Sequence, residues 1–214
     1  MDKGMSNLLS WSIENSQNAQ QPTQDGTSTQ QPGSKGAEPR GLTEDAIRSL
    51  MGGPSDADLM KEAMHVVVNP EATLDNKVIA FDNFEQLIEN LDNANNMEPL
   101  GLWTPLMNQL ESSEPSMRKM AAWCVGTAVQ NNEKCQHYLL GIGGVPKVAK
   151  MAVEDSDNAA RRKAVYALSS TVRNFQPGMD EALKVLPSNV TGPDHVNASD
   201  MDVIDAIMAK LREG

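Results

Sequence analysis

Residues 118–131 read RKMAAWCVGTAVQN, and the same pattern returns without a gap 43 positions later as RRKAVYALSSTVRN, residues 161–174. A weaker third copy spans residues 76–89. A helical repeat of about 40 to 47 residues is typical of armadillo and HEAT arrays. The sequence therefore predicts an all-α, armadillo-like, right-handed α-solenoid. Both clear copies carry apolar residues at the spacing of one helix face: Ala121, Val125 and Val129, then Ala164, Leu168 and Val172.

The composition favours one elongated helical core over a two-domain enzyme. The chain has 214 residues, of which 39% are hydrophobic and only 4% aromatic. The net charge of −11 argues against a nucleic-acid binder, because such a protein needs a cationic surface to displace counterions from phosphate. An acidic chain of this kind suits binding to other proteins.

The cysteine count and the apolar runs predict a cytoplasmic protein. Two cysteines are too few for a disulfide scaffold, and the longest uncharged apolar run, residues 121–129, is about half of what a membrane span requires. Polar residues interrupt the apolar start at Asp2, Asn7 and Glu14, so no signal peptide is expected. We therefore expect no contact with a membrane.

The chain is expected to divide into five segments. Residues 1–16 form a short amphipathic segment, and residues 17–41 a disordered tether, because that stretch contains no Leu, Ile, Val, Met or aromatic residue. An armadillo-like repeat domain follows at residues 42–186, then a loop at residues 187–198. An amphipathic helix with an acidic outer face, capped by Ser199, is expected at residues 199–212.

Turn-forming residues indicate where the helices of the repeat domain end. The Gly-rich run at residues 141–146 is interpreted as a turn between stacked helices, because the spacing of a phosphate-binding loop with its Lys-Ser/Thr pair is absent and no strand pattern precedes the run. Residues 93–99 are expected to form a polar turn, and Pro177-Gly178 to interrupt the chain before a helix at residues 179–186. Further helices are expected at residues 42–51, 55–68, 73–91 and 103–110.

The sequence contains no pattern typical of a catalytic or metal site. His65, His137 and His195 lie in different units, and the pair formed by Cys135 and His137 is far short of a four-ligand zinc site. No Gly-x-Ser-x-Gly nucleophile motif is present. We therefore expect a protein that is not an enzyme and that binds no cofactor and no metal.

The repeat helices also differ from those of peptide carriers. Armadillo proteins that capture extended peptides place an Asn four residues after a Trp on the inner helix. Here the Asn is absent at every corresponding pair, which favours a surface for a folded partner. The aromatic residues Trp123 and Tyr166 are expected to pack in the core, and Trp123→Ala to cost about 3 to 5 kcal/mol. The pairs are Phe81/Glu85, Trp123/Thr127 and Tyr166/Ser170.

Four motifs in the same order resemble a known family. The chain is similar to the Fes/HspBP armadillo-type nucleotide exchange factors of heat-shock protein 70, in their short fungal-type form. Two departures stand out: Ser170 replaces the usual Asn, and the chain ends soon after the third clear repeat. The motifs are LLSWSIENS at residues 8–16, LIENLDNANN at 87–96, GTAVQNN at 126–132 and AVYALSSTVRN at 164–174.

The resemblance implies a monomeric cytosolic co-chaperone that binds the ATPase domain of heat-shock protein 70 and accelerates ADP release. It also implies that the N-terminal part helps to free misfolded clients, with Leu8, Leu9 and Trp11 in that motif. On the repeat helices we expect Ala80 to permit close approach and Arg173 to form a forked ion pair with the partner. The full set of expected partner-binding residues is Ala80, Glu85, Arg118, Thr127, Arg162, Tyr166, Ser170 and Arg173.

Two other functions stay open at the level of the sequence. A generic armadillo scaffold would bind extended peptides and leave ADP release unchanged. A hydrolase whose site crosses several helices would require titratable groups gathered in a pocket.

Overall fold

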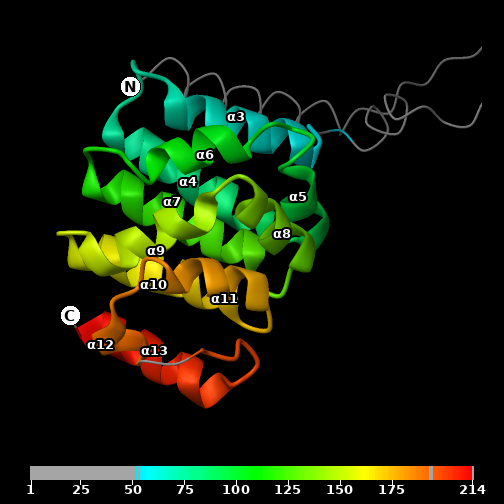
Figure 1. The fold of residues 1–214 in the computed structure, drawn as a ribbon. Coiled ribbons are helices and arrows are strands. Elements are labelled where there is room, and N and C mark those ends of the chain that lie inside the picture. The colour runs from blue at the N-terminus through cyan, green and yellow to red at the C-terminus, as the bar shows by residue number, and fades with distance from the viewer. Residues whose placement is uncertain (1–51, 53, 193–194, 214) are drawn as a thin grey trace, which may run out of the picture. The chain divides into compact units, whose positions relative to one another are not determined.

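A computed structural model describes Gly52, residues 54–192 and residues 195–213 of the chain. In these residues all regular secondary structure is helical, with eleven helices and no strand (Figure 1). The helices from Asp56 onward belong to one compact unit. The predicted all-α fold is therefore confirmed, whereas the predictions for the N-terminal segment, the tether and the helix at residues 42–51 lie outside the described residues.

The helices form an N-terminal pair followed by three units of three. The third helices of these units begin at residues 115, 158 and 201, so each starts 43 residues after the one before. The pair is α3 (Asp56–Val68) and α4 (Leu74–Ile88). The units are α5 (Leu91–Asn96), α6 (Trp103–Gln109) and α7 (Pro115–Val129); α8 (Glu133–Gly141), α9 (Gly144–Glu154) and α10 (Asn158–Val172); and α11 (Gln176–Leu183), α12 (Ser188–Thr191) and α13 (Met201–Glu213).

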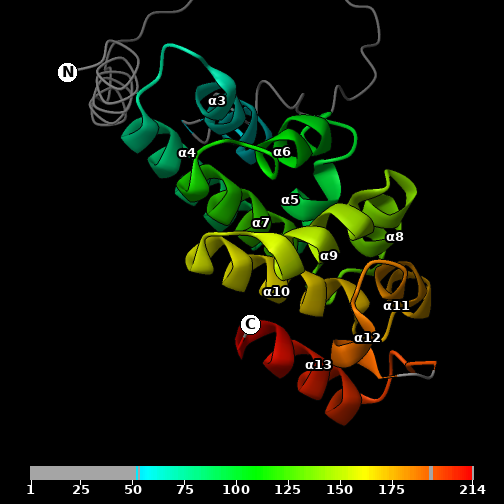
Figure 2. The same ribbon diagram turned by 60° about the vertical axis from the view of Figure 1, so that its left-hand side comes forward.

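The helices α4, α7, α10 and α13 lie side by side in one row (Figure 2). The sequence predicted an array that ends after its third repeat, but α11 to α13 add a further three-helix unit at its C-terminal end. This unit lacks the basic start of the earlier copies, and only its apolar stripe follows the repeat. Two sets of equivalent buried residues show this: Ala121, Ala164 and Ile207, and Val125, Leu168 and Leu211.

The turns between units repeat as closely as the helices do. Asn131 follows α7 and Asn174 follows α10, and both have left-handed backbone conformations, with φ of 52° and 55°. Asn tolerates this conformation better than most residues, because its short polar side chain can bond locally. After the first turn, Gln136 of α8 donates hydrogen bonds to the carbonyl oxygens of Ser170 and Thr171, which lie at the end of α10. This contact ties the first helix of that unit to its third helix.

The Gly-rich run between α8 and α9 forms the turn that the sequence predicted. Gly143 lies in this turn with a φ of 69°, a conformation that glycine adopts without a steric penalty. Pro146 then falls in the first turn of α9, where its missing N–H costs little.

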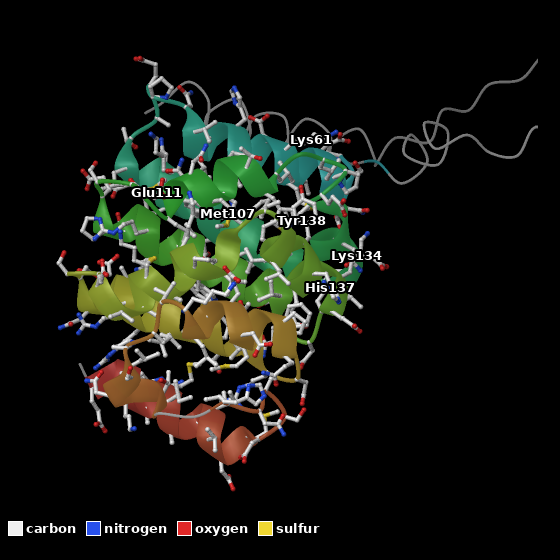
Figure 3. All side chains as sticks on the ribbon, viewed as in Figure 1. Lys61, Met107, Glu111, Lys134, His137 and Tyr138 are labelled. Atoms are coloured by element: carbon white, nitrogen blue, oxygen red, sulfur yellow. The ribbon has the colours of Figure 1, made fainter. Side chains whose placement is uncertain are left out.

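Aromatic contacts join helices of successive units on the side seen in Figure 3. Tyr138 of α8 packs against Trp103 of α6, with ring centroids 5.6 Å apart. His137, also on α8, meets Phe175 at the start of α11 edge to face, at 4.7 Å. Trp103 is 1% exposed and is among the largest fully buried side chains. These contacts connect helices that lie outside the row of α4, α7, α10 and α13.

Three boundaries differ from the sequence predictions. The expected polar turn at residues 93–99 begins inside α5, where the buried Asn93 donates to a carboxylate oxygen of Asp56 at 2.8 Å. Pro177 does not interrupt the helical structure, since it occupies the first turn of α11. The expected loop at residues 187–198 contains α12.

The cap of the last helix also differs. The side chain of Asp200, rather than that of Ser199, accepts the hydrogen bond from the Val203 amide. A carboxylate in this place is favoured because the positive end of the helix dipole lies there.

None of the helices in the described part of the chain is both long and apolar enough to cross a membrane.

Candidate protein-binding site

The close packing of α7 against α10 depends on a glycine. A Cβ atom placed on Gly126 would lie 2.5 Å from Cε1 of Tyr166 and 3.0 Å from the Cα of Ala167. The Tyr166 ring therefore rests directly on the backbone of α7. Its hydroxyl donates a hydrogen bond of 2.9 Å to Oε1 of Gln130. These contacts fix the tyrosine between the two helices, with part of its surface still exposed.

Two hollows flank Tyr166. The larger, of about 560 Å³, is lined from α7 and α10. The smaller, of about 430 Å³, lies towards the C-terminal ends of the same helices. The larger is lined by Lys119, Asn158, Ala159, Arg162, Lys163 and Tyr166. The smaller is lined by Gln130, Asn131, Glu133, Gln136, Tyr166, Ser169, Ser170, Arg173 and Asn174.

A lysine covers the partly buried tryptophan of α7. Nζ of Lys163 lies 3.3 Å from the centroid of the Trp123 ring and 5.7 Å from that of Tyr166. Burial lowers the pKa of the Lys163 ammonium, the Glu85 carboxylate opposes this effect, and repulsion from Lys119 adds to it. An ammonium over an indole face is held by the ring quadrupole. Trp123 thus packs against the core while keeping a polar cover, so the predicted core position holds only in part.

Where peptide carriers have an Asn on the inner helix, this chain has Glu85, Thr127 and Ser170. Thr127 of α7 donates a hydrogen bond of 2.6 Å to Oε1 of Glu85 on α4. Glu85 is buried, and this burial raises the pKa of its carboxyl. Ser170 is buried at the third such position. Two of the three positions therefore bond to each other across neighbouring helices.

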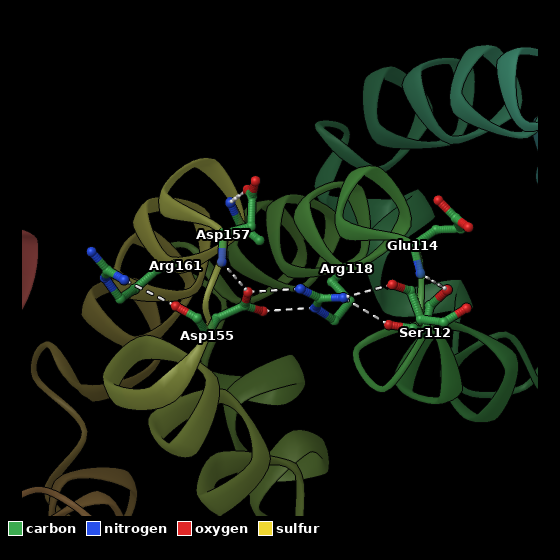
Figure 4. A network of polar contacts seen from close by, with 8 residues as sticks. Ser112, Glu114, Arg118, Asp155, Asp157 and Arg161 are labelled. Carbon is green, nitrogen blue, oxygen red and sulfur yellow. Dashed lines mark hydrogen bonds and ion pairs between the residues drawn. The ribbon is translucent and has the colours of Figure 1, made fainter.

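Arg118 links two consecutive units, as Figure 4 shows. Its Nε and Nη2 donate to the two carboxylate oxygens of Asp155, each at 2.8 Å, and its Nη1 donates to the carbonyl oxygen of Ser112 at 2.9 Å. Arg161 repeats the second contact 43 residues later, since its Nη1 donates to the carbonyl oxygen of Asp155 at 2.9 Å. The guanidinium of Arg118 is only 16% exposed. Its contacts are therefore those of a structural residue.

Arg173 also has partners within the chain. Its Nε donates to Oγ of Ser169 at 2.9 Å, its Nη1 contacts Sδ of Met201 at 3.2 Å, and its Nη2 pairs with Asp205. Met201 and Asp205 belong to α13. Arg173 therefore holds the last helix of the row against α10, in addition to lining the smaller hollow.

The structure brings some of the predicted binding residues to one surface and buries others. Ala80 is 6% exposed and lies in the core, so it offers no surface for close approach. Thr127, Tyr166 and Arg173 are partly exposed, and Arg162 is exposed. Glu85, Ser170 and Arg118 are buried or bonded within the chain, as described above.

Sequence reasoning missed other residues of this surface, which we call the α7–α10 face. Lys119, Gln130 and Lys163 line the hollows or cover Trp123. The basic start shared by both repeats is the signal that indicates Lys119 and Lys163, whereas no comparable signal indicates Gln130. The α7–α10 face is defined by Lys119, Trp123, Thr127, Gln130, Arg162, Lys163, Tyr166 and Arg173.

The cysteines and acids do not form a reactive group near this face. Cys124 and Cys135 are free and buried, and burial raises the pKa of both thiols, in Cys135 to about 11. A thiol with such a pKa stays protonated and is a poor nucleophile near neutral pH. Across the described residues, no group of three His, Cys, Asp or Glu side chains is placed to hold a metal ion.

Comparison with known proteins identifies the family. The model of nucleotide exchange factor Fes1 matches residues 5–97, and the model of the SIL1/FES1/HPBP1 C-terminal domain matches residues 93–185. A protein of Coccidioides immitis named Hsp70 nucleotide exchange factor FES1 is 58% identical over 214 residues, which cover 100% of this chain and 99% of the relative. The chain belongs to the Fes1 family.

Other members of the Fes1 family align over nearly the whole chain. The Hsp70 nucleotide exchange factor FES1 of Gibberella zeae is 51% identical, covering 99% of this chain and 97% of its own length. The Hsp70 nucleotide exchange factor fes-1 of Neurospora crassa is 46% identical, covering 99% of this chain and 98% of its own length. The two family models meet in α5, so the C-terminal model of the Fes1 family covers both helices of the α7–α10 face. The resemblance seen in the sequence is thus confirmed.

Proposed function

We propose that this Fes1-family protein binds the ATPase domain of a heat-shock protein 70 through the α7–α10 face and accelerates the release of ADP. The observation that carries the proposal is the alignment over the full chain with relatives named Hsp70 nucleotide exchange factors. The face itself supports it, because it combines half-exposed aromatic rings, cations and two hollows on rigid helices. Aromatic residues and Arg are the side chains enriched where proteins bind one another.

The proposed mechanism needs no catalytic group. A protein that binds the nucleotide-free ATPase domain more tightly than the ADP-bound form must weaken ADP binding by the same factor. The contribution of this chain is a surface whose shape is set before binding. Packing of Tyr166 on Gly126 and the double hydrogen bond between Arg118 and Asp155 both hold α7 and α10 in place. A preformed surface loses little conformational entropy when it binds.

The proposal also covers the N-terminal segment, the oligomeric state and the cellular compartment. We propose that Leu8, Leu9 and Trp11 help to release misfolded client segments, and these residues lie outside the described part of the chain. We further propose that the protein acts as a monomer in the cytoplasm. The free cysteines at positions 124 and 135 are compatible with a reducing compartment.

Stopped-flow release of a fluorescent ADP analogue from an Hsp70 ATPase domain tests the proposed function. The wild-type protein should accelerate release by about 5- to 150-fold, the usual range of coupling between two binding sites. Gln130→Arg places a bulky cation in the smaller hollow and should remove most of this effect. Asn108→Arg, at an exposed position on α6, makes the same kind of change elsewhere and should act like the wild type.

Two outcomes would contradict the proposal. If the wild-type protein bound extended peptides and left the ADP release rate unchanged, the chain would be a general armadillo scaffold. If Gln130→Arg accelerated release as well as the wild type did, the α7–α10 face would not be the docking surface.

A further inference from the structure

The larger hollow of the α7–α10 face has an unusual charge for this chain. The protein has 29 acidic and 18 basic side chains. Yet the hollow is lined by three cations, Lys119, Arg162 and Lys163, and by no carboxylate. The other lining residues are neutral, and Tyr166 contributes an aromatic wall. This hollow is therefore cationic and partly apolar, although the chain as a whole is acidic.

Two neighbouring cations have polar partners within the chain. Arg118 is paired with Asp155, and Arg161 donates to the Asp155 carbonyl oxygen and to Asn158. Within the part of the chain that the structure describes, no salt bridge involves Lys119, Arg162 or Lys163. The positive charge around the hollow is therefore largely uncompensated.

Nearby groups do not cancel this charge. Glu85 is the carboxylate that raises the pKa of Lys163. It is buried and accepts a hydrogen bond from Thr127. Lys119 and Lys163 repel each other, and this repulsion is one cause of the lowered pKa of Lys163, after burial. Trp123 holds the Lys163 ammonium in position from one side. The cations are thus kept together although their mutual repulsion opposes it.

We propose that this hollow receives an acidic segment of the Hsp70 ATPase domain, whose carboxylates pair with Lys119, Arg162 and Lys163. The inference rests on the proposed function and names the chemistry of the partner's docking element. A guanidinium such as that of Arg162 binds a carboxylate through two parallel hydrogen bonds, which fixes orientation as well as affinity. Because the rest of this chain is acidic, an acidic segment is repelled elsewhere and attracted here, so the charge pattern selects one docking orientation.

The test compares two double variants with the same change in net charge. Lys119→Glu with Arg162→Glu reverses the charge at the hollow. Lys147→Glu with Lys150→Glu makes the same change on α9, at exposed side chains that do not belong to the α7–α10 face. Circular dichroism and thermal unfolding of both variants establish that they are folded.

The measurements are the Kd for the Hsp70 ATPase domain at several salt concentrations and the ADP release rate. We expect the first variant to bind about tenfold more weakly or worse, because like charges that face each other oppose association at an interface. The control should stay within about twofold of the wild type, since exposed charges outside an interface act mainly through weak long-range attraction. Added salt should weaken the wild type and affect the first variant less.

The outcomes separate this inference from the proposed function. If the wild type accelerates ADP release and the Lys119→Glu, Arg162→Glu protein binds as the control does, the acidic docking element is refuted and the proposed function stands. If the wild type neither binds the ATPase domain nor accelerates release, both are refuted. Selective weakening of the first variant, with a flatter salt dependence, supports both.

Discussion

The carboxylate of Asp155 accepts two hydrogen bonds of 2.8 Å from the guanidinium of Arg118. This pair joins α7 to the turn that precedes α10, and the Asp155 side chain is only 4% exposed. Asp155→Asn removes the charge and one acceptor, so Arg118 is left with a poorer partner. We expect the free energy of unfolding, measured in urea, to fall by about 2 to 3 kcal/mol.

Glu111→Gln is the control variant for Asp155→Asn. Glu111→Gln breaks the pair between Glu111 and Lys147, where both side chains are well exposed. Solvent and salt weaken such a pair, so the free energy of unfolding should hardly change. Equal losses in the two variants would show that the buried pair holds the units no better than a surface one.

The same pair predicts how stability changes with pH. The hydrogen bonds from Arg118 are the main cause of the lowered pKa of Asp155, and burial opposes them. Because the folded-state pKa lies below the unfolded one, the contribution is complete above the unfolded value, about 3.9. It is lost as the pH falls through the folded-state pKa. Thermal unfolding between pH 7 and pH 2 should show this acid loss reduced in Asp155→Asn.

Gly126→Ala tests the contact that positions Tyr166. The added methyl group would meet the Tyr166 ring at 2.5 Å, so the ring or α10 must move. Such overpacking costs about 1 to 3 kcal/mol, and the displaced ring should also weaken binding to the Hsp70 ATPase domain. Gly141→Ala is the control, because its Cβ would meet nothing within 4 Å. If Gly126→Ala were as stable and active as Gly141→Ala, close approach of the two helices would not matter.

The two tryptophans of the described residues should respond differently to truncation. Trp103 is fully buried, so Trp103→Ala should cost about 3 to 5 kcal/mol in urea unfolding. Trp123 is partly exposed, and Trp123→Ala should cost clearly less while removing the seat of the Lys163 ammonium. We therefore expect Trp123→Ala to impair partner binding more than stability. A loss of stability as large as that of Trp103→Ala would place Trp123 in the core.

A charge exchange separates the two roles of Arg173. Arg173→Glu should lower the free energy of unfolding by about 1 kcal/mol, because it faces Asp205 across α10 and α13. Adding Asp205→Arg should restore most of that loss by re-forming the pair in reverse. If Arg173 also contacts the chaperone, the double variant should regain thermal stability and still accelerate ADP release poorly. Recovery of both properties together would leave Arg173 with a structural role alone.

The sequence predicted the helical repeat well because the apolar stripe and the turn residues are local signals. The repeated Asn at positions 131 and 174 is one example, since both copies adopt the same left-handed turn. The helices at residues 179–186 and 199–212 were predicted, but not that α11 to α13 form a further repeat unit, because α13 retains the buried positions of the repeat without the basic residues that made the other copies recognisable.

The candidate site was harder to predict than the fold, since its features arise between helices. No local pattern in the sequence shows that Arg118 forms an ion pair with Asp155 of the following unit. Nor does the sequence show that Ala80 faces the core, because several sides of α4 are apolar. The Tyr166 ring can pack closely on α7 because Gly126 lies opposite it on that helix, and such a pairing becomes visible only in three dimensions.

The identical turns at Asn131 and Asn174 bear on how such proteins change length during evolution. Asn174 lies 43 residues after Asn131, and the two residues have nearly the same φ. An unequal recombination between the two copies in the gene would insert or remove one whole layer and restore the same junction. Natural variation in this family can therefore proceed in steps of complete layers, each of which leaves the remaining helices in register.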